Sequence, residues 1–317
     1  MKIETPKSSI EVLKELQFQP IKTAVRQSIA VVDEAMKGNR DLFISKWPRL
    51  NRNLLGGFQP GKLYIIGGRP GTGKSAFSNQ LIFDLLDNAQ LESKKVVVFY
   101  WSFEMPGYQQ LLRTAAKDTK KNMMQLYSVD DTLDTKSFEI FKKSVTKYVK
   151  YPVYFQSKPR DAKYIEDACT KYHLSSPETT IINIVDHSRL VPGEEDKEME
   201  RLNSLSKMFM RTQANMNTLN ILLSQLNRNI EREDRAKNQY QPLLTDLFGG
   251  DSIGQDAHVV MLIQRPHDLY GIRETYCGEN PVGLLALHIE KNRDGMLGMI
   301  PYEFSGSTFT INERRKK

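Results

Sequence analysis

Residues 68–75 are Gly68-Arg69-Pro70-Gly71-Thr72-Gly73-Lys74-Ser75, and they match the phosphate-binding pattern G-x-x-x-x-G-K-[ST] in full. The apolar segment Leu63 to Ile66 predicts a strand before this loop, and apolar residues at helical spacing from Phe77 predict a helix after it. Glycines let backbone N–H groups and the helix N-terminus face an anion, Lys74 adds a cation near the terminal phosphates, and Ser75 offers a hydroxyl to Mg²⁺. The loop therefore predicts a site for ATP and Mg²⁺.

Predicted strands and helices alternate on either side of the loop. Further strands are predicted at Val96 to Trp101, Val153 to Phe155, Ile181 to Val185, Leu219 to Leu223, Val259 to Ile263 and Leu284 to Ile289. Helical stretches at 106–117, 160–173 and 194–217 separate the earlier strands. This alternation predicts an α/β fold, with a mainly parallel sheet covered by helices on both faces. The strands from residue 258 onward lie too close together for helical crossovers, so we expect antiparallel hairpins at one edge.

The composition is that of an ordinary globular protein, with 39% hydrophobic and 26% charged residues. No apolar run is long enough to span a bilayer, and residues 1–6 do not form a signal-type segment, so we expect a cytoplasmic protein without a membrane partner. Cys169 and Cys277 lack C-x-x-C spacing and predict neither a metal site nor a disulfide. The net charge of +7 suits a polyanion, but the basic tail 313–317 supplies much of it, so basicity alone is weak evidence for nucleic-acid binding.

Two acidic residues are candidates for the chemistry at the phosphate site. Asp186 follows the apolar strand that begins at Ile181, where a P-loop protein needs a second magnesium ligand. Glu104 follows the strand Val96 to Trp101 and could orient and deprotonate water. Because ligands of such sheets bind at the carboxyl ends of the strands, both side chains are expected near the γ-phosphate. By itself, Asp186 would be interpreted as a cap or turn residue, and Glu104 as a surface residue.

An amphipathic helix is predicted before the loop. Its apolar face carries Ile21, Val25, Ile29, Val32 and Met36, and it ends near Gly38. The spacing leaves two alternatives open, since such a face can pack on its own domain or on a neighbouring subunit.

Taken in order, these motifs resemble the C-terminal, RecA-like motor domain of DnaB-type replicative helicases from bacteria and phages, through most of residues 21–305. The resemblance runs through an ordered series of segments: 45–51, 56–61, 67–74, 102–105, 185–186, 224–228, 246–257 and 291–295. It implies an ATP hydrolase and DNA helicase, acting as a homo-hexamer that translocates on single-stranded DNA. It implies that Gln225 senses the γ-phosphate, and that Lys291 and Arg293 reach the ATP site of the adjacent subunit.

The resemblance also divides the chain. Residues 1–45 are expected to form an N-terminal segment and a linker helix that docks on the next subunit, residues 46–312 the RecA-like P-loop motor, and residues 313–317 a basic tail. If the protein is phage-encoded, its compartment is the host cytoplasm.

Two departures from the family pattern are evident. About twenty residues precede the linker helix, so the family's helical N-terminal domain is expected to be missing, and contacts with a primase or loader cannot be transferred. The second departure lies in the family's DNA-binding loop. Its usual arginine, glutamate, serine and glycine are replaced here by Phe248-Gly249-Gly250-Asp251. The two glycines could present backbone N–H groups to a phosphate while Phe248 stacks on a base. The alternative is a tight turn with a core phenylalanine.

Two other functions share these motifs. One is a RecA-class recombination or mediator ATPase that forms filaments, against which the segments 224–228 and 291–293 argue. The other is a nucleotide-gated ring scaffold that binds partners without acting as an enzyme.

Overall fold

The structure is a computed structural model that describes residues 9–16, 18–129, 133–193 and 198–315. It comprises two compact units, Met1–Asp41 and Leu42–Lys317. In the first unit, α1 spans Ser9–Glu15 and α2 spans Ile21–Met36, where the helix was predicted. The apolar face of α2 is between 50% and 83% exposed. Docking of this face on another subunit stays a prediction.

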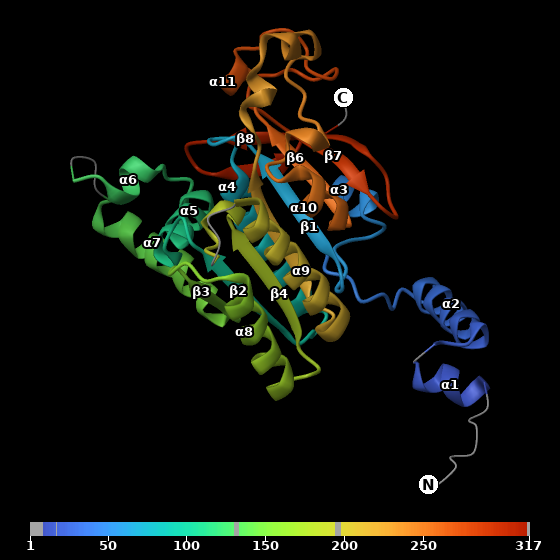
Figure 1. Ribbon diagram of the computed structural model, residues 1–317. Coiled ribbons are helices and arrows are strands. Elements are labelled where there is room, and N and C mark those ends of the chain that lie inside the picture. Colours follow the sequence, from blue (N-terminus) through green and yellow to red (C-terminus); the bar gives the residue numbers. More distant parts are fainter. Residues whose placement is uncertain (1–8, 17, 130–132, 194–197, 316–317) are drawn as a thin grey trace. The chain divides into compact units, whose positions relative to one another are not determined.

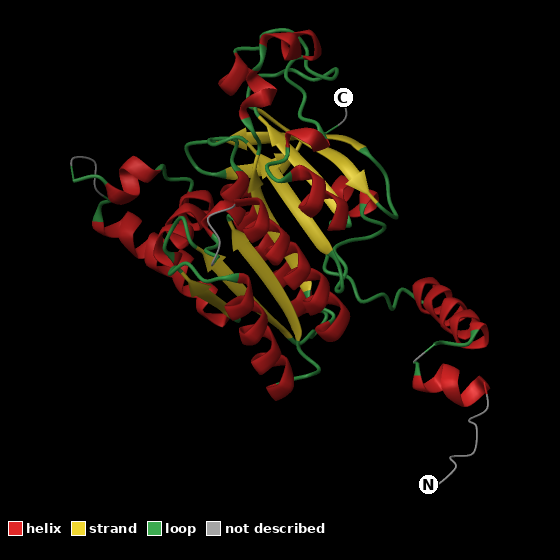
Figure 2. Ribbon diagram, viewed as in Figure 1, coloured by secondary structure: helices red, strands yellow, loops and turns green. Residues whose placement is uncertain are grey.

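The second unit is built on one nine-stranded sheet of order β3-β2-β4-β5-β1-β6-β7-β8-β9 (Figure 2). The strands are β1 Leu63–Gly68, β2 Val96–Ser102, β3 Val153–Gln156, β4 Thr180–Asp186, β5 Leu219–Gln225, β6 Val259–Gln264, β7 Leu284–Asn292, β8 Gly298–Ser305 and β9 Thr310–Glu313. The pairs from β3 to β6 are parallel, and those from β6 to β9 are antiparallel. The prediction of a mainly parallel sheet with an antiparallel edge is confirmed.

β6 takes part in both kinds of pairing. It pairs antiparallel with β7, as expected for the strands from residue 258 onward, and its other edge pairs parallel with β1, with Val259 opposite Tyr64, which was not predicted. The reason lies in the long connection from β5, which contains several 3₁₀ turns and α10, Gly250–Asp256. That connection has the length that a parallel crossover requires.

Helices cover both faces of the sheet. The helices of this unit are α3 Pro48–Asn53, α4 Lys74–Leu91, α5 Gly107–Thr119, α6 Met123–Tyr127, α7 Thr135–Thr146, α8 Ala162–Ser175, α9 Glu198–Met216, α10 and α11 Pro266–Tyr270. Figure 1 shows α8 and α9 side by side across one face. Of the stretch 194–217 predicted as helical, residues 194–197 lie outside the described residues, as do Lys316 and Lys317 of the predicted tail.

The two faces bury separate hydrophobic clusters. Tyr64 and Ile66 of β1 pack with α4, whereas Leu63 and Ile65 pack with α8 and α9. Successive residues of a strand point to opposite faces, so an uninterrupted apolar strand is the pattern that a doubly covered sheet requires. This packing fixes β1 at the centre and places the P-loop at its carboxyl end. No helix among the described residues has the length and apolar character needed to cross a membrane.

Candidate functional site

The P-loop connects β1 to α4 as predicted. Gly68 ends β1, and Lys74 begins α4. Gly71 and Gly73 have φ values of +80° and +95°, a left-handed conformation in which an L side chain would be strained. The Lys74 ammonium group donates to the carbonyl oxygens of Gly68 at 2.8 Å and Arg69 at 3.1 Å. Burial lowers the pKa of Lys74 to about 8, an effect that the charges of Asp186 and Glu104 oppose.

Asp186 lies at the carboxyl end of β4 and is 1% exposed. Among the described residues, neither carboxylate oxygen has a partner with hydrogen-bond geometry. Burial raises the pKa of this carboxyl group to about 6; the charge of Glu104 adds to the rise, and Ser75 and Lys74 oppose it. An unpartnered buried carboxylate beside a hydroxyl is costly unless a cation binds there. The donors therefore fit Mg²⁺, which on a P-loop takes one hydroxyl, one carboxylate, nucleotide oxygens and water.

Glu104 and Gln225 approach the same hollow from β2 and β5, the strands on either side of β4. Glu104 follows β2 and is 57% exposed, and Gln225 ends β5 directly opposite Gly68 of β1. Both line an open hollow of about 270 Å³ together with Lys74 and Ser75. The structure thus brings the P-loop together with Glu104 and Gln225, which were predicted from separate segments of the sequence, and places the Asp186 carboxylate close enough to feel the charge of Lys74. The roles of these residues remain predictions.

His187 was not singled out from the sequence. It directly follows Asp186, is 6% exposed, and lies between Glu104 and Gln225. Burial lowers the pKa of its imidazole, which the charge of Glu104 opposes and that of Lys74 reinforces. The only signal in the sequence was its place next to Asp186.

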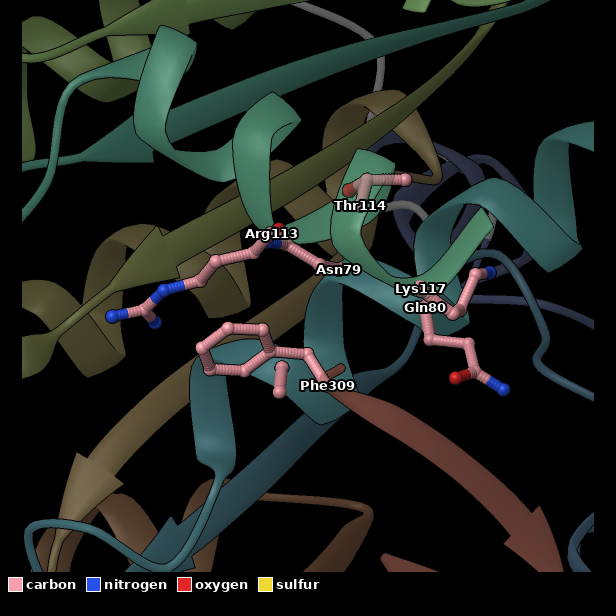
Figure 3. A pocket seen from close by; sticks show the side chains of 7 residues that line it. Asn79, Gln80, Arg113, Thr114, Lys117 and Phe309 are labelled. Carbon is pink, nitrogen blue, oxygen red and sulfur yellow. The ribbon is translucent and has the colours of Figure 1, made fainter. Parts of the chain in front are cut away.

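Two pairs of a cation and an aromatic ring also border the hollow and were missed. The guanidinium group of Arg265 lies 4.8 Å from the ring of Phe304 and donates to the carbonyl oxygen of Gly71 at 3.1 Å. Arg113 lies 5.1 Å from the ring of Phe309, and in Figure 3 its side chain extends over that ring. The turn between β8 and β9 supplies Phe309 and α5 supplies Arg113, so no local motif links them.

Lys291 and Arg293 do not join the P-loop of their own chain. Lys291 donates to the carbonyl oxygens of Gly254 at 2.9 Å and Gln255 at 2.6 Å, and Arg293 donates to that of Gln255 at 2.9 Å. The two cations thus hold the C-terminal carbonyl groups of α10. Lys291 pairs with Val260, near the start of β6, whereas the P-loop lies at the carboxyl ends of the parallel strands. Within one chain the two sites are therefore at opposite ends of the sheet.

The Phe248–Gly250 segment leads into α10 and has the geometry of a tight turn. Phe248 is partly buried against the cluster that contains α9, and the Arg189 guanidinium group lies 4.6 Å from its ring. Gly249 has a φ of +71°, and a Cβ atom there would lie 2.3 Å from Leu202 Cδ1. Both residues thus have structural reasons for their identity, and a role in DNA binding stays a prediction.

A P-loop on the central strand of a mainly parallel sheet, with polar side chains at the ends of the neighbouring strands, defines the class of RecA-like P-loop proteins. Within that class, residues 44–313 match the model of the DnaB-like helicase C terminal domain. The chain belongs to this family, and the resemblance inferred from its motifs is confirmed.

Individual relatives agree with this assignment. The chain is 27% identical over 272 residues to the replicative DNA helicase DnaB of Mycoplasma pneumoniae, covering 82% of this chain and 55% of that protein. It therefore spans about half the length of this curated relative. A solved structure described as an ATPase domain has the same fold, with a TM-score of 0.78 and 18% identity over 92% of this chain and 99% of that one. A DnaB-like replicative helicase, described with its interactions with primase, matches with a TM-score of 0.75 and 19% identity, over 96% of this chain and 73% of that one.

Proposed function

We propose that this chain is the ATP-hydrolysing motor of a replicative DNA helicase, which assembles as a homo-hexameric ring and translocates on single-stranded DNA. The observation that carries the proposal is that Lys74, Glu104 and Gln225 line one hollow at the carboxyl ends of parallel strands. Family membership supports the same activity.

Each side chain has a position suited to one part of hydrolysis. The P-loop amides and Lys74 would bind the phosphates, and Ser75 and Asp186 would hold Mg²⁺, which offsets charge on the phosphate oxygens. The exposed carboxylate of Glu104 is available to accept a proton from the attacking water. Gln225 reaches the hollow from the strand beside the P-loop strand, where its amide could detect the terminal phosphate.

The separation of Lys291 and Arg293 from their own P-loop supports a role at a subunit interface. A nucleotide that contacts these cations would have to be bound to another chain. Within one chain, the cations lie at the end of the sheet opposite the P-loop. A cation supplied in trans stabilises charge that develops on the phosphoryl group and makes hydrolysis depend on assembly. Primase is a partner class to test, since one structural relative is described with it.

The test is an ATPase assay with and without single-stranded DNA, together with electron microscopy in a non-hydrolysable ATP analogue. We expect DNA-stimulated hydrolysis and six-membered rings, with Lys74→Ala as the inactive control. Filaments would instead favour a recombination ATPase. Rings without hydrolysis would favour a nucleotide-gated scaffold, and either result would overturn the proposal.

A further inference from the structure

His187 lies between the two residues proposed to act on the terminal phosphate and its attacking water. Its Nε2 atom is 3.2 Å from the amide nitrogen of Gln225 and 3.9 Å from Oε2 of Glu104. The ring is buried at the end of β4, whereas Glu104 follows β2 and Gln225 ends β5. One imidazole nitrogen is therefore within reach of side chains from two other strands.

The backbone around His187 decides which ring nitrogen carries the proton. The N–H group of Arg189 donates to Nδ1 of His187 at 3.3 Å, in the first turn of the 3₁₀ helix Ser188–Leu190. Because Nδ1 accepts a hydrogen bond, its lone pair is engaged and it cannot carry a proton. A neutral imidazole has one N–H group, so in this ring the proton is on Nε2.

An Nε2–H group needs an acceptor, and the neighbouring amide can supply one. Rotation of a glutamine amide by 180° exchanges its oxygen and nitrogen positions, and the hydrogen-bond partners decide between them. The donor on His187 requires the amide oxygen of Gln225 at the 3.2 Å contact. The NH₂ group of Gln225 then faces away from the imidazole, available to donate to a phosphate oxygen in the hollow that Gln225 lines.

We propose that His187 is a positioning residue, whose Nε2–H group fixes the amide of Gln225 so that its NH₂ group faces the terminal phosphate. Oε2 of Glu104 lies 3.9 Å from the same nitrogen, too far for a hydrogen bond, so the carboxylate acts on the ring only through its charge. His187 thus lies beside the residue proposed to activate water, but its hydrogen bond goes to the residue proposed to sense the phosphate. This inference rests on the proposed ATPase function.

A purely structural role predicts a different response to mutation. If His187 served only to cap the 3₁₀ helix, His187→Asn would preserve its function, because asparagine is a good acceptor for a backbone N–H group two residues on. Asparagine is too short to present a donor at the position of Nε2. His187→Gln places an amide near that position and is the matched rescue variant.

The first measurement is ATP turnover in a double-mutant cycle. For His187→Asn we expect unchanged affinity for a non-hydrolysable ATP analogue and a fall in kcat of about 10- to 100-fold, since a misplaced group costs about that much. His187→Gln should recover most of the rate. In a Gln225→Ala background, His187→Asn should reduce kcat less than twofold. Normal kcat in His187→Asn, or an equal loss with and without Gln225, would overturn the proposal.

The second measurement needs no turnover, so it separates failure of this inference from failure of the ATPase proposal. In the full chain labelled with ¹⁵N-histidine, His187→Asn assigns the His187 signals among the five histidines. We expect the neutral ring to be protonated on Nε2, and the Nε2 signal to shift in Gln225→Ala. A proton on Nδ1, or no shift, would overturn the inference even if the protein hydrolyses ATP. If the wild-type protein gives the expected spectrum but does not hydrolyse ATP, the hydrogen bond between His187 and Gln225 stands and the proposed ATPase function is wrong.

Discussion

Replacing Gly249 with alanine tests whether the turn before α10 is fixed by packing. The residue has a φ of +71°, and holding an alanine in this left-handed conformation costs about 1–2 kcal/mol. The added Cβ would also lie 2.3 Å from Cδ1 of Leu202, a side chain buried in α9 that has little room to move. Such overpacking costs about 1–3 kcal/mol, so the free energy of unfolding should fall by about 2–5 kcal/mol in total.

A matched glycine separates the two contributions. Gly271 has a φ of +64°, but a Cβ atom there would meet nothing within 4 Å. Gly271→Ala should therefore cost only the backbone term of about 1–2 kcal/mol. The excess cost of Gly249→Ala over Gly271→Ala measures the clash. In a Leu202→Ala background this excess should disappear, because the opposing methyl group is absent.

The assay is equilibrium denaturation in urea, followed by single-stranded DNA binding under conditions in which every variant is folded. Equal costs for Gly249→Ala and Gly271→Ala would refute the packing argument. If the folded Gly249→Ala protein binds DNA with normal affinity, the turn serves the fold alone. A loss of affinity beyond the loss of folded protein would support the predicted presentation of backbone N–H groups to DNA.

Four further outcomes are expected. Lys74→Ala should abolish ATP hydrolysis, whereas Glu104→Gln should bind nucleotide yet turn over about 100-fold or more slowly, and near-normal turnover would remove Glu104 from the role of base. Arg293→Ala subunits should be inactive alone but regain activity when mixed with Lys74→Ala subunits, and a failure to regain it would argue against action in trans. Deleting residues 1–40 should give folded monomers by sedimentation; a remaining hexamer would show that α2 is dispensable for assembly. Burial lowers the pKa of His288 to about 4, so the native state resists its protonation, and as the pH drops from 6.5 to 4 the wild type should lose about 3 kcal/mol more stability than His288→Leu.

The sequence predicted those parts of the site that depend on local order along the chain. The P-loop is a continuous motif, and Asp186 and Glu104 each follow a recognisable apolar strand, so the rule that ligands bind at strand ends was enough to place them together. The parallel pairing of β6 was not predicted, because it depends on how the connection from β5 folds rather than on the strand's own residues.

Side chains that act through tertiary contacts gave no comparable signal. Arg113 and Phe309 are almost two hundred positions apart and meet only because α5 and the turn between β8 and β9 border the same hollow. His187 was visible as the residue after Asp186, but its proximity to Glu104 and Gln225 depends on the order of β2, β4 and β5 in the sheet. Periodicity and motif spacing carry no information on that order.

Lys291 and Arg293 show how contacts within one chain bear on a function between chains. In the single chain, their cationic groups satisfy carbonyl groups of Gly254 and Gln255 at the end of α10. Hydrogen bonds from charged donors contribute about 1.5–3 kcal/mol each, so a cation that moves to a neighbouring nucleotide must gain at least that much from its phosphates. The same helix begins at Gly250, directly after the turn predicted to contact DNA. Engagement of a neighbour's nucleotide would therefore alter the hydrogen bonding of α10 at one end, while DNA binding would act on its other end. This helix is thus the element through which the two predicted contacts would influence each other.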